Sequence, residues 1–157
     1  MIERFCLKQM LTFEEGYKLK VYPDQFGYKT VGIGTNIEAN NPVDIIGRSL
    51  RMGDKITSYE CDKLFQYCFT KTCKQIKQHI YFFNDLDYIR AAAIINLSYQ
   101  LGIYGLLEFK RFLKCMEQKD WDGAVVELRD SKYAHQTPER CERVAQLVMG
   151  NIPEEYK

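Results

Sequence analysis

Two carboxylates and a hydroxyl fall within one short segment near the start of the chain, at Glu15, Asp24 and Thr30. Hydrolysis of a glycosidic bond needs a proton for the leaving oxygen and either a second carboxylate or a water molecule as nucleophile. A carboxylic acid beside apolar neighbours can keep its proton near neutral pH, whereas one in an exposed turn stays ionised. Glu15 therefore fits the general acid and Asp24 the general base. The pair alone is weak evidence, because a chain with 21 acidic residues contains many such pairs.

The residues around this segment predict a helix followed by a β-hairpin. Apolar residues recur at helical spacing before Glu15, and Gly16 is a typical helix stop because glycine readily adopts a left-handed backbone conformation. Residues 18–22 alternate as in a half-buried strand, and residues 23–27 have the composition of a turn. Glu15 would then lie at the end of the helix, before the first strand, and Asp24 in the turn between the two strands.

Residues 28–34 are predicted to form the returning strand. Because successive side chains of a strand point to opposite faces, Thr30 shares a face with Gly32 and Gly34. Glycine within a strand often marks the close approach of another backbone or of a bound molecule. We therefore expect this face to admit a ligand.

The segment EEGYKLKVYPDQFGYKTVGIG resembles the phage-type lysozymes of the T-even class, glycoside hydrolase family 24, in register, spacing and residue identity. Residues 90–102, 121–133 and 136–144 also resemble that family, in the same order, so the similarity covers nearly the whole chain. The resemblance implies a muramidase, which cleaves the β-1,4 bond between N-acetylmuramic acid and N-acetylglucosamine in bacterial peptidoglycan. Members of this class invert the anomeric centre.

The same resemblance implies a role for each residue of the site. Glu15 would be the general acid, Asp24 the base or electrostatic partner, and Thr30 a group that helps to hold the attacking water. Arg140 matches a position whose guanidinium pairs with the catalytic glutamate, and such a partner favours the ionised acid. Inversion requires the two carboxyl groups to stand roughly 6.5 to 9.5 Å apart, so that a water molecule fits between them.

Three further residues, Asn36, Tyr99 and Gln100, fall at positions that line the saccharide cleft in the family, and we expect them to bind substrate. Tyr99 replaces a more usual phenylalanine, and the chain also departs from the family pattern at Thr35, Phe112 and Glu127. Thr35 stands where many relatives have histidine, so any charge pair made by that imidazole is missing. The other two replace a small hydroxyl and an amide residue, which suggests altered handling of the glycan or of its peptide stem.

The predicted fold class is α+β and lysozyme-like. A small N-terminal β-hairpin lobe, residues 15–56, would be joined by a long helix to a larger helical lobe, residues 57–157 with an N-terminal helix 1–13. Thr57 and Glu60 form a capping box at the start of that long helix, which is expected over residues 58–79. We predict one domain spanning residues 1–157.

Capping residues predict the remaining helices. Asp87 precedes a helix over 88–101 that Gly102 would end, and Asp120 precedes another. Thr137 and Pro138 would begin a last helix that ends at Gly150. A short helix is expected near residues 43–50, and the aromatic run at residues 81–83 is expected in the core.

Composition excludes several classes of protein. The chain has 157 residues, 46% of them hydrophobic, and a mean hydropathy of −0.36, as is typical of one globular domain. A formal net charge of +1 gives no electrostatic reason to expect nucleic acid as a partner. The family resemblance implies that the chain binds peptidoglycan glycan strands, and we expect a monomer that needs no cofactor.

The six cysteines are not spaced as a zinc site, because no paired CxxC sets occur and the two histidines lie far from any cysteine cluster. We predict no metal. In a chain without a visible leader, reduced and mostly buried thiols are favoured over disulfides. Whether any of these thiols pair stays open at this point.

The N-terminal residues carry charges and contain no apolar run long enough for a signal peptide or a membrane-spanning helix. We therefore expect no stable membrane insertion and location in the host bacterial cytoplasm before lysis, with action on the periplasmic cell wall. The family resemblance implies that an endolysin of this kind needs a separate holin. Alternatives are a virion-associated or toxin-type muramidase of the same fold, a glycan-binding protein that has lost catalysis, and a lytic transglycosylase.

Overall fold

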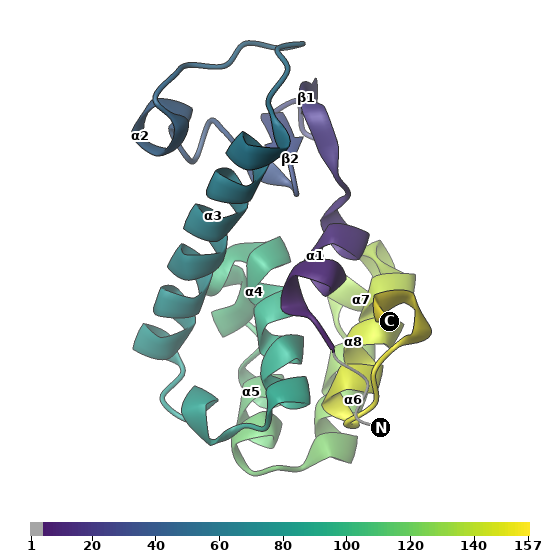
Figure 1. Cartoon of the computed structure of the whole chain (residues 1–157). Helices are drawn as coiled ribbons and strands as arrows, with labels where there is room; N and C mark the ends of the chain where they lie inside the picture. The colour runs from purple at the N-terminus through teal and green to yellow at the C-terminus, as the bar shows by residue number, and fades with distance from the viewer. Residues whose placement is uncertain (1–4) are drawn as a thin grey trace. The chain divides into compact units, whose positions relative to one another are not determined.

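The computed structural model describes residues 5–157, which form a mostly helical chain with a small antiparallel sheet near its N-terminal end (Figure 1). The chain divides into two compact units. The sheet unit comprises Leu11–Lys71, and the helical unit comprises the chain up to Met10 together with Thr72–Lys157. These observations confirm the predicted α+β class. That the whole chain acts as one domain stays a prediction.

The sheet unit contains three antiparallel strands in the order β1-β2-β3, where the sequence predicted only two. The strands are β1 (Lys18–Pro23), β2 (Lys29–Gly32) and β3 (Thr35–Asn36). The strand predicted over residues 28–34 ends early because Gly32 and Gly34 both have positive φ, at 69° and 63°. This backbone conformation is accessible to glycine and turns the chain back into β3.

Two helices of this region differ from their predicted bounds. Helix α1 spans Leu7–Glu15, so Glu15 is its last residue, and the first four residues of the helix predicted over 1–13 lie outside the described residues. Helix α2 spans Pro42–Ile46, shorter than the predicted 43–50. It ends early because Gly47 adopts a left-handed conformation, with φ of 76°, and its backbone N–H donates to Val43 O.

The long helix α3 spans Ser58–His79, as predicted. Its capping box is confirmed: the Glu60 backbone N–H donates to Thr57 Oγ1 at 3.1 Å, and the Thr57 N–H donates to Glu60 Oε1 at 3.0 Å. The helix begins in the sheet unit and ends in the helical unit. It buries apolar residues at helical spacing, among them Cys61, Leu64, Phe65 and Ile76.

The helical unit is built on five helices, α4 (Tyr88–Leu107), α5 (Lys110–Glu117), α6 (Trp121–Arg129), α7 (Lys132–Gln136) and α8 (Pro138–Val148). Helix α4 supplies a continuous buried run from Ala92 to Ser98 and packs against α8. The predicted caps at Asp87 and Asp120 are confirmed, since each carboxylate accepts a backbone N–H three residues later. Helices α5 and α7 were not predicted.

One expectation about this unit was confirmed and another was wrong. Gly102 ends the predicted helix, because its backbone is non-helical, with φ of 74° and ψ of 165°; α4 therefore consists of two helical stretches on either side of a kink, the second of which ends at Leu107. Tyr81 is not a core residue, because its side chain is 77% exposed, whereas Phe82 and Phe83 are buried as predicted. An aromatic run therefore contributed only two of its three rings to the core.

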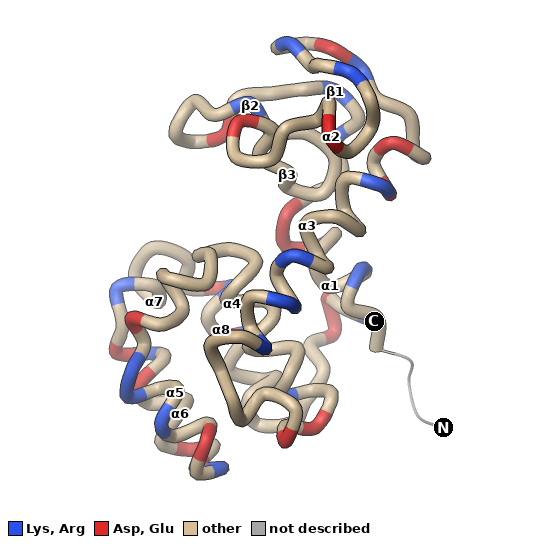
Figure 2. The backbone as a smooth tube through the Cα atoms, turned by 90° about the vertical axis from the view of Figure 1, so that its left-hand side faces the viewer, with Lys and Arg blue, Asp and Glu red and all other residues tan. Residues whose placement is uncertain are grey.

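Acidic and basic residues are interspersed along both units (Figure 2), in keeping with the net charge of +1. Among the described residues, no helix has both the length and the apolar content to cross a membrane.

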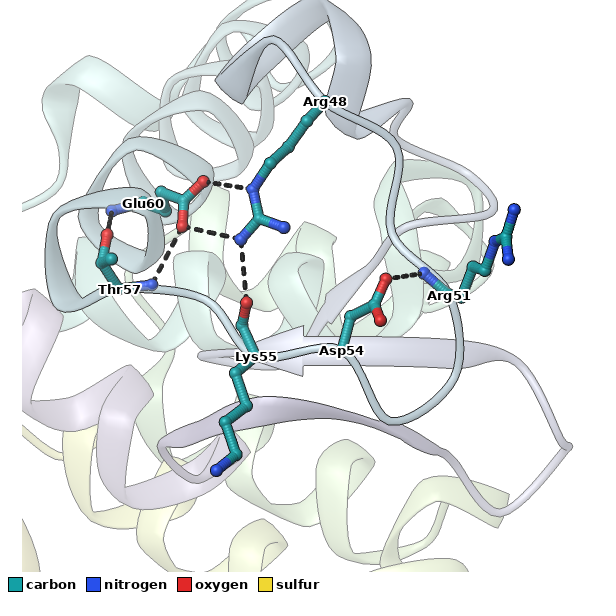
Figure 3. Close-up of polar contacts among 6 residues, drawn as sticks. All are labelled: Arg48, Arg51, Asp54, Lys55, Thr57 and Glu60. Atoms are coloured by element: carbon teal, nitrogen blue, oxygen red, sulfur yellow. Dashed lines mark hydrogen bonds and ion pairs between the residues drawn. The ribbon is translucent and has the colours of Figure 1, made fainter.

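A polar cluster ties the loop before α3 to the first turn of that helix (Figure 3). Arg48 donates from Nε to Glu60 Oε2 at 2.8 Å and from Nη2 to Glu60 Oε1 at 2.9 Å, and Nη2 also donates to the Lys55 carbonyl at 2.8 Å. Hydrogen bonding from Arg48 lowers the pKa of Glu60 from its ordinary value of 4.5 to about 2. Glu60 therefore stabilises both the helix start and the loop.

The variant Glu60→Gln is expected to lower the thermal midpoint at pH 7 by roughly 2–4 °C, about 1 kcal/mol, because it weakens the capping box and a surface ion pair. Since folding depresses the pKa of Glu60, its contribution is complete above pH 4.5 and is lost as pH falls towards 2. The wild-type midpoint should therefore fall more steeply than that of the variant between pH 5 and pH 2.5. Calorimetry of both proteins over this pH range measures the midpoints. If the midpoints of wild type and variant fall in parallel with pH, this account is contradicted.

Glu142→Gln is the matched control. Glu142 makes a similar bidentate ion pair with Arg129, in which Nε donates to Oε1 and Nη2 donates to Oε2, each at 2.9 Å. Both side chains are more than half exposed. Exposed pairs of this kind contribute little to stability, so this variant should change the thermal midpoint less than Glu60→Gln does.

Candidate active site

Glu15 is held against the backbone of the turn between β2 and β3. A Cβ atom added at Gly34 would lie 2.8 Å from Glu15 Cβ and 2.9 Å from Glu15 Oε2, and Gly34 has φ of 63°. A Cβ added at Gly32 would similarly meet Cys61 Sγ at 3.1 Å. The expectation that these glycines leave room for a ligand was therefore wrong at these two positions, because protein side chains fill the space. At Gly34 the absence of a side chain admits the candidate acid itself.

The variant Gly34→Ala should therefore damage both folding and activity. Alanine at positive φ costs about 1–3 kcal/mol of stability, and the new methyl group collides with the Cβ of Glu15 rather than with a movable side-chain end. Displacement of a catalytic group by about 1 Å can cost on the order of 10²-fold in rate. The measurements are a urea denaturation curve and the specific activity on cell walls.

Gly47→Ala is the control, since Gly47 also has positive φ but has nothing within 4 Å of its would-be Cβ. It should lose stability and keep activity. Equal activity losses in the two variants would show that backbone strain alone, and not contact with Glu15, explains the effect.

Asp24 lies in the turn after β1, where the backbone fixes one of its two carboxylate oxygens. Its Oδ1 accepts the backbone N–H groups of Phe26 at 2.8 Å and of Tyr28 at 2.9 Å. Its own N–H donates to the Tyr28 carbonyl at 2.9 Å. Within residues 5–157, Oδ2 makes no hydrogen bond. The carboxylate is thus oriented through one oxygen and can receive a proton on the other.

Tyr22 connects the two carboxylates electrostatically. Burial raises the pKa of the Tyr22 phenol, and the negative charges of Glu15 and Asp24 raise it further. Both acids therefore lie within electrostatic reach of one phenol. In the sheet, Tyr22 stands directly opposite Thr30 on the neighbouring strand.

Thr30 is buried, with 5% of its surface exposed, and its hydroxyl donates to the Tyr28 carbonyl at 3.0 Å. The proton of the hydroxyl is therefore used within the hairpin, while a lone pair of Oγ1 can still accept a hydrogen bond. A water molecule beside Thr30 would donate one of its protons to that oxygen. Thr30 is thus equipped to orient a water molecule rather than to contact a large ligand surface.

Asn36 stands opposite Thr30 in the sheet. Its side-chain Oδ1 accepts the backbone N–H groups of Glu38 at 2.9 Å and of Ala39 at 3.1 Å, so half of the amide group serves the turn after β3. No described residue hydrogen-bonds with its Nδ2 group. Only that NH₂ group is available for the predicted contact with a sugar.

The other three predicted site residues belong to the helical unit. Arg140 is buried on α8, where Nε donates to Asn96 Oδ1 at 2.9 Å, and the Asn96 amide donates in turn to the Tyr156 hydroxyl at 3.1 Å. Tyr99 and Gln100 lie half-buried on α4. The pairing of Arg140 with Glu15 and the sugar contacts of the α4 residues stay predictions.

Thr35 is 1% exposed, and its hydroxyl oxygen has no hydrogen-bond partner in the part of the chain that the structure describes. Burial raises the pKa of the nearby Cys68 thiol, and the Thr35 hydroxyl opposes that rise. A neutral hydroxyl beside a thiol therefore stands at the position where the family resemblance predicted a histidine. Among the described residues, no group of three His, Cys, Asp or Glu side chains is arranged to hold a metal ion.

The sequence reasoning missed two residues of this site, Tyr22 and Gly34. Tyr22 has a local signal, since it ends the predicted strand two residues before Asp24. The contact between Gly34 and Glu15 has no local signal, because it joins a helix end to a turn well removed along the chain.

Comparison with known proteins identifies the class. The model of the phage lysozyme family matches residues 12–148. The chain is 36% identical to "Probable T4-type lysozyme 1" and 33% identical to "Probable T4-type lysozyme 2", both of Dictyostelium discoideum, over 96% of this chain and 98% of each relative. It is 30% identical to the "Pre-baseplate central spike protein Gp5" of Enterobacteria phage T4, over 96% of this chain and 28% of that protein.

The chain belongs to the phage lysozyme family. It is accordingly a glycoside hydrolase of the lysozyme type, and peptidoglycan is its class of substrate. The α+β fold with a small sheet and a larger helical part is the lysozyme-like fold that the sequence predicted.

Proposed function

We propose that this enzyme cleaves the β-1,4 bond between N-acetylmuramic acid and N-acetylglucosamine with inversion at the anomeric carbon. The observation that carries the proposal is that one small unit holds Glu15 at the end of α1 against Gly34 and holds Asp24 in the turn after β1 with one carboxylate oxygen fixed by two backbone N–H groups. Thr30, opposite Tyr22 in the sheet, keeps an oxygen lone pair for a water molecule. This is the set of groups that an inverting hydrolysis requires.

In the proposed reaction, Glu15 gives its proton to the glycosidic oxygen as the bond from that oxygen to the muramyl C1 breaks. A water molecule attacks C1 from the opposite face of the ring, and Asp24 Oδ2 takes the proton that this water loses. Thr30 orients the water by accepting its second hydrogen. The products are a free 4-hydroxyl on glucosamine and a 1-hydroxyl on muramic acid, so that one water molecule is consumed for each bond.

Residues of both units are assigned supporting roles. Tyr22 keeps its proton at neutral pH, as a phenol with the ordinary pKa of 10 does and as the raised pKa reinforces, so it can donate a hydrogen bond to the substrate or to the water. Arg140, whose guanidinium donates to Asn96, is assigned the role of the positive charge that pairs with the Glu15 carboxylate. Asn36, Tyr99 and Gln100 are assigned to binding the sugars.

Digestion of purified sacculi, followed by mass spectrometry of the soluble fragments, tests this assignment. Reducing muramic acid ends are expected. Anhydromuramic ends would assign the protein to the lytic transglycosylases, and reducing glucosamine ends would assign it to a different bond. Binding to sacculi without release of any fragment would show a glycan-binding protein that has lost catalysis.

For its biological setting we propose an endolysin that acts as a monomer. It would collect in the host bacterial cytoplasm and reach the periplasmic wall when a separate holin opens the membrane. A virion-associated muramidase is the second candidate, because the chain resembles part of a phage spike protein. Detection of the chain in purified phage particles would favour the second setting, and its absence from particles together with holin-dependent lysis would favour the first.

A further inference from the structure

The outer edge of β1 carries a groove of about 490 Å³ that lies wholly within the sheet unit. Its lining includes Lys18, Lys20, Tyr22, Met52 and Gly53. Strand β1 forms one wall, and the loop that carries Met52 and Gly53 forms the other, held by a hydrogen bond from the Gly53 N–H to the Val21 carbonyl at 3.1 Å. We call this feature the β1 groove.

Two lysines, Lys18 and Lys20, line the β1 groove, and Lys55 lies beside it. Lys20 and Lys55 form an antiparallel bridge, so their side chains leave the backbone directly opposite each other. Lys18 lies farther along β1 towards α1, and all three lysines are exposed. Figure 2 shows basic segments on β1 and on the neighbouring loop, and Figure 3 shows the Lys55 side chain extending away from Arg48 and Glu60. The groove therefore has two positive charges in its lining, among apolar residues, and a third beside it.

The fold does not neutralise this charge. No acidic side chain within residues 5–157 forms an ion pair with any of the three lysines. Like charges directly opposite each other across a bridge destabilise a sheet, so the pairing of Lys20 with Lys55 costs stability in the free protein. An anionic ligand in the groove would offset that cost.

The β1 groove leads to the candidate catalytic residues. Lys18 Nζ lies 4.2 Å from the centre of the Tyr22 ring, a cation–π contact that holds the ammonium group over the tyrosine. Tyr22 is the residue on which both Glu15 and Asp24 act. The Lys18 ammonium group therefore lies beside the tyrosine that both proposed catalytic carboxylates influence.

We propose that the β1 groove binds the peptide stem of peptidoglycan through the carboxylates of that stem. This inference rests on the proposed function. The glycan rings carry neutral hydroxyl and acetamido groups, whereas the stem is attached to the muramyl residue at the cleaved bond and carries free carboxylates. An extended stem that lies along β1 would bring its carboxylates to the two lysines that line the groove, Lys18 and Lys20.

Binding to sacculi tests the proposal without requiring hydrolysis. The chain carries Glu15→Gln throughout, so that the substrate stays intact, and it is compared with a version that also carries Lys18→Gln, Lys20→Gln and Lys55→Gln. Three surface charge contacts of a few-fold each predict a roughly tenfold weaker apparent affinity for untreated sacculi in co-sedimentation. Sacculi whose carboxylates have been converted to amides with carbodiimide and ammonia should bind both versions equally.

The matched control removes the same total charge from exposed lysines of α3, by Lys63→Gln, Lys74→Gln and Lys77→Gln. Lys63 also lies over an aromatic ring, that of Tyr59, at 4.9 Å. This control should bind untreated sacculi as tightly as the parent does. Circular dichroism confirms that each variant is folded.

If the lysine variant binds amidated sacculi as much more weakly than its parent as it binds untreated sacculi, the lysines bind phosphate or another anion and the proposal is overturned. If the lysine variant binds untreated sacculi as tightly as its parent, the proposal is overturned outright. The failure of the proposed function looks different. In that case the wild-type chain would release no muramic acid ends from untreated sacculi, while the lysine-dependent binding would still be measured.

Discussion

Replacing Glu15 with glutamine is expected to abolish the clearing of outer-membrane-stripped Gram-negative cells, with a loss on the order of 10³-fold in rate. Glutamine has nearly the same shape as glutamate and can rest against Gly34 as the acid does. It has no proton of suitable acidity to give to the leaving oxygen. The fold should therefore be retained, with an unchanged circular dichroism spectrum, while the rate in a turbidity assay disappears.

Glu14→Gln is the control for this prediction, because it changes the same residue type one position earlier on α1. It should retain most of the activity. If Glu15→Gln still lyses cells at a rate close to wild type, Glu15 is not the general acid and the proposed mechanism fails.

Replacing Asp24 with asparagine is expected to reduce the rate by roughly 10²- to 10⁴-fold. The asparagine side chain can keep an oxygen in the place of Oδ1 and accept the same two backbone N–H groups, so the turn should stay folded. The other position becomes an amide, which cannot take a proton from water. Hydrolysis should therefore fail at the attack step, and initial rates on purified peptidoglycan measure the loss.

Asp54→Asn provides a matched comparison in the same unit. Asp54 also orders a turn through its carboxylate, which accepts the Arg51 backbone N–H at 2.7 Å, but we assign it no part in the reaction. This variant should keep near wild-type activity. Comparable losses in both variants would show that turn stability, and not proton acceptance, explains the effect at Asp24.

Local signals predicted the elements of this fold whose ends are set by neighbouring residues. The bounds of α3 follow from its capping box and its apolar period, both visible in the sequence. Gly102 likewise interrupts α4 where its local signal predicted a helix end. Tyr81 was misjudged because burial depends on more distant packing, and the packed core accepted only part of an aromatic run.

Some features of the candidate site were also predictable from local sequence signals, and others were not. Residue types and their spacing brought Glu15, Asp24 and Thr30 to attention, together with the expectation that one hairpin holds them. The sequence did not reveal that the hydroxyl proton of Thr30 is used by the Tyr28 carbonyl, or that Gly34 is needed as a contact surface for Glu15. Both depend on backbone geometry that forms only when the hairpin folds. The β1 groove likewise depends on a bridge between Lys20 and Lys55, which are far apart in the sequence.

Inversion at the anomeric carbon tests the central claim most directly, since it requires a water molecule to attack while Asp24 takes its proton and Glu15 protonates the opposite side. Proton NMR of soluble glycan fragments, recorded in the first minutes of digestion before mutarotation, reports the configuration of each new muramic acid end. The account predicts that the α-anomer appears first and the β-anomer follows as the sugar equilibrates. Initial formation of the β-anomer would mean retention through a covalent or equivalent intermediate, and would contradict it.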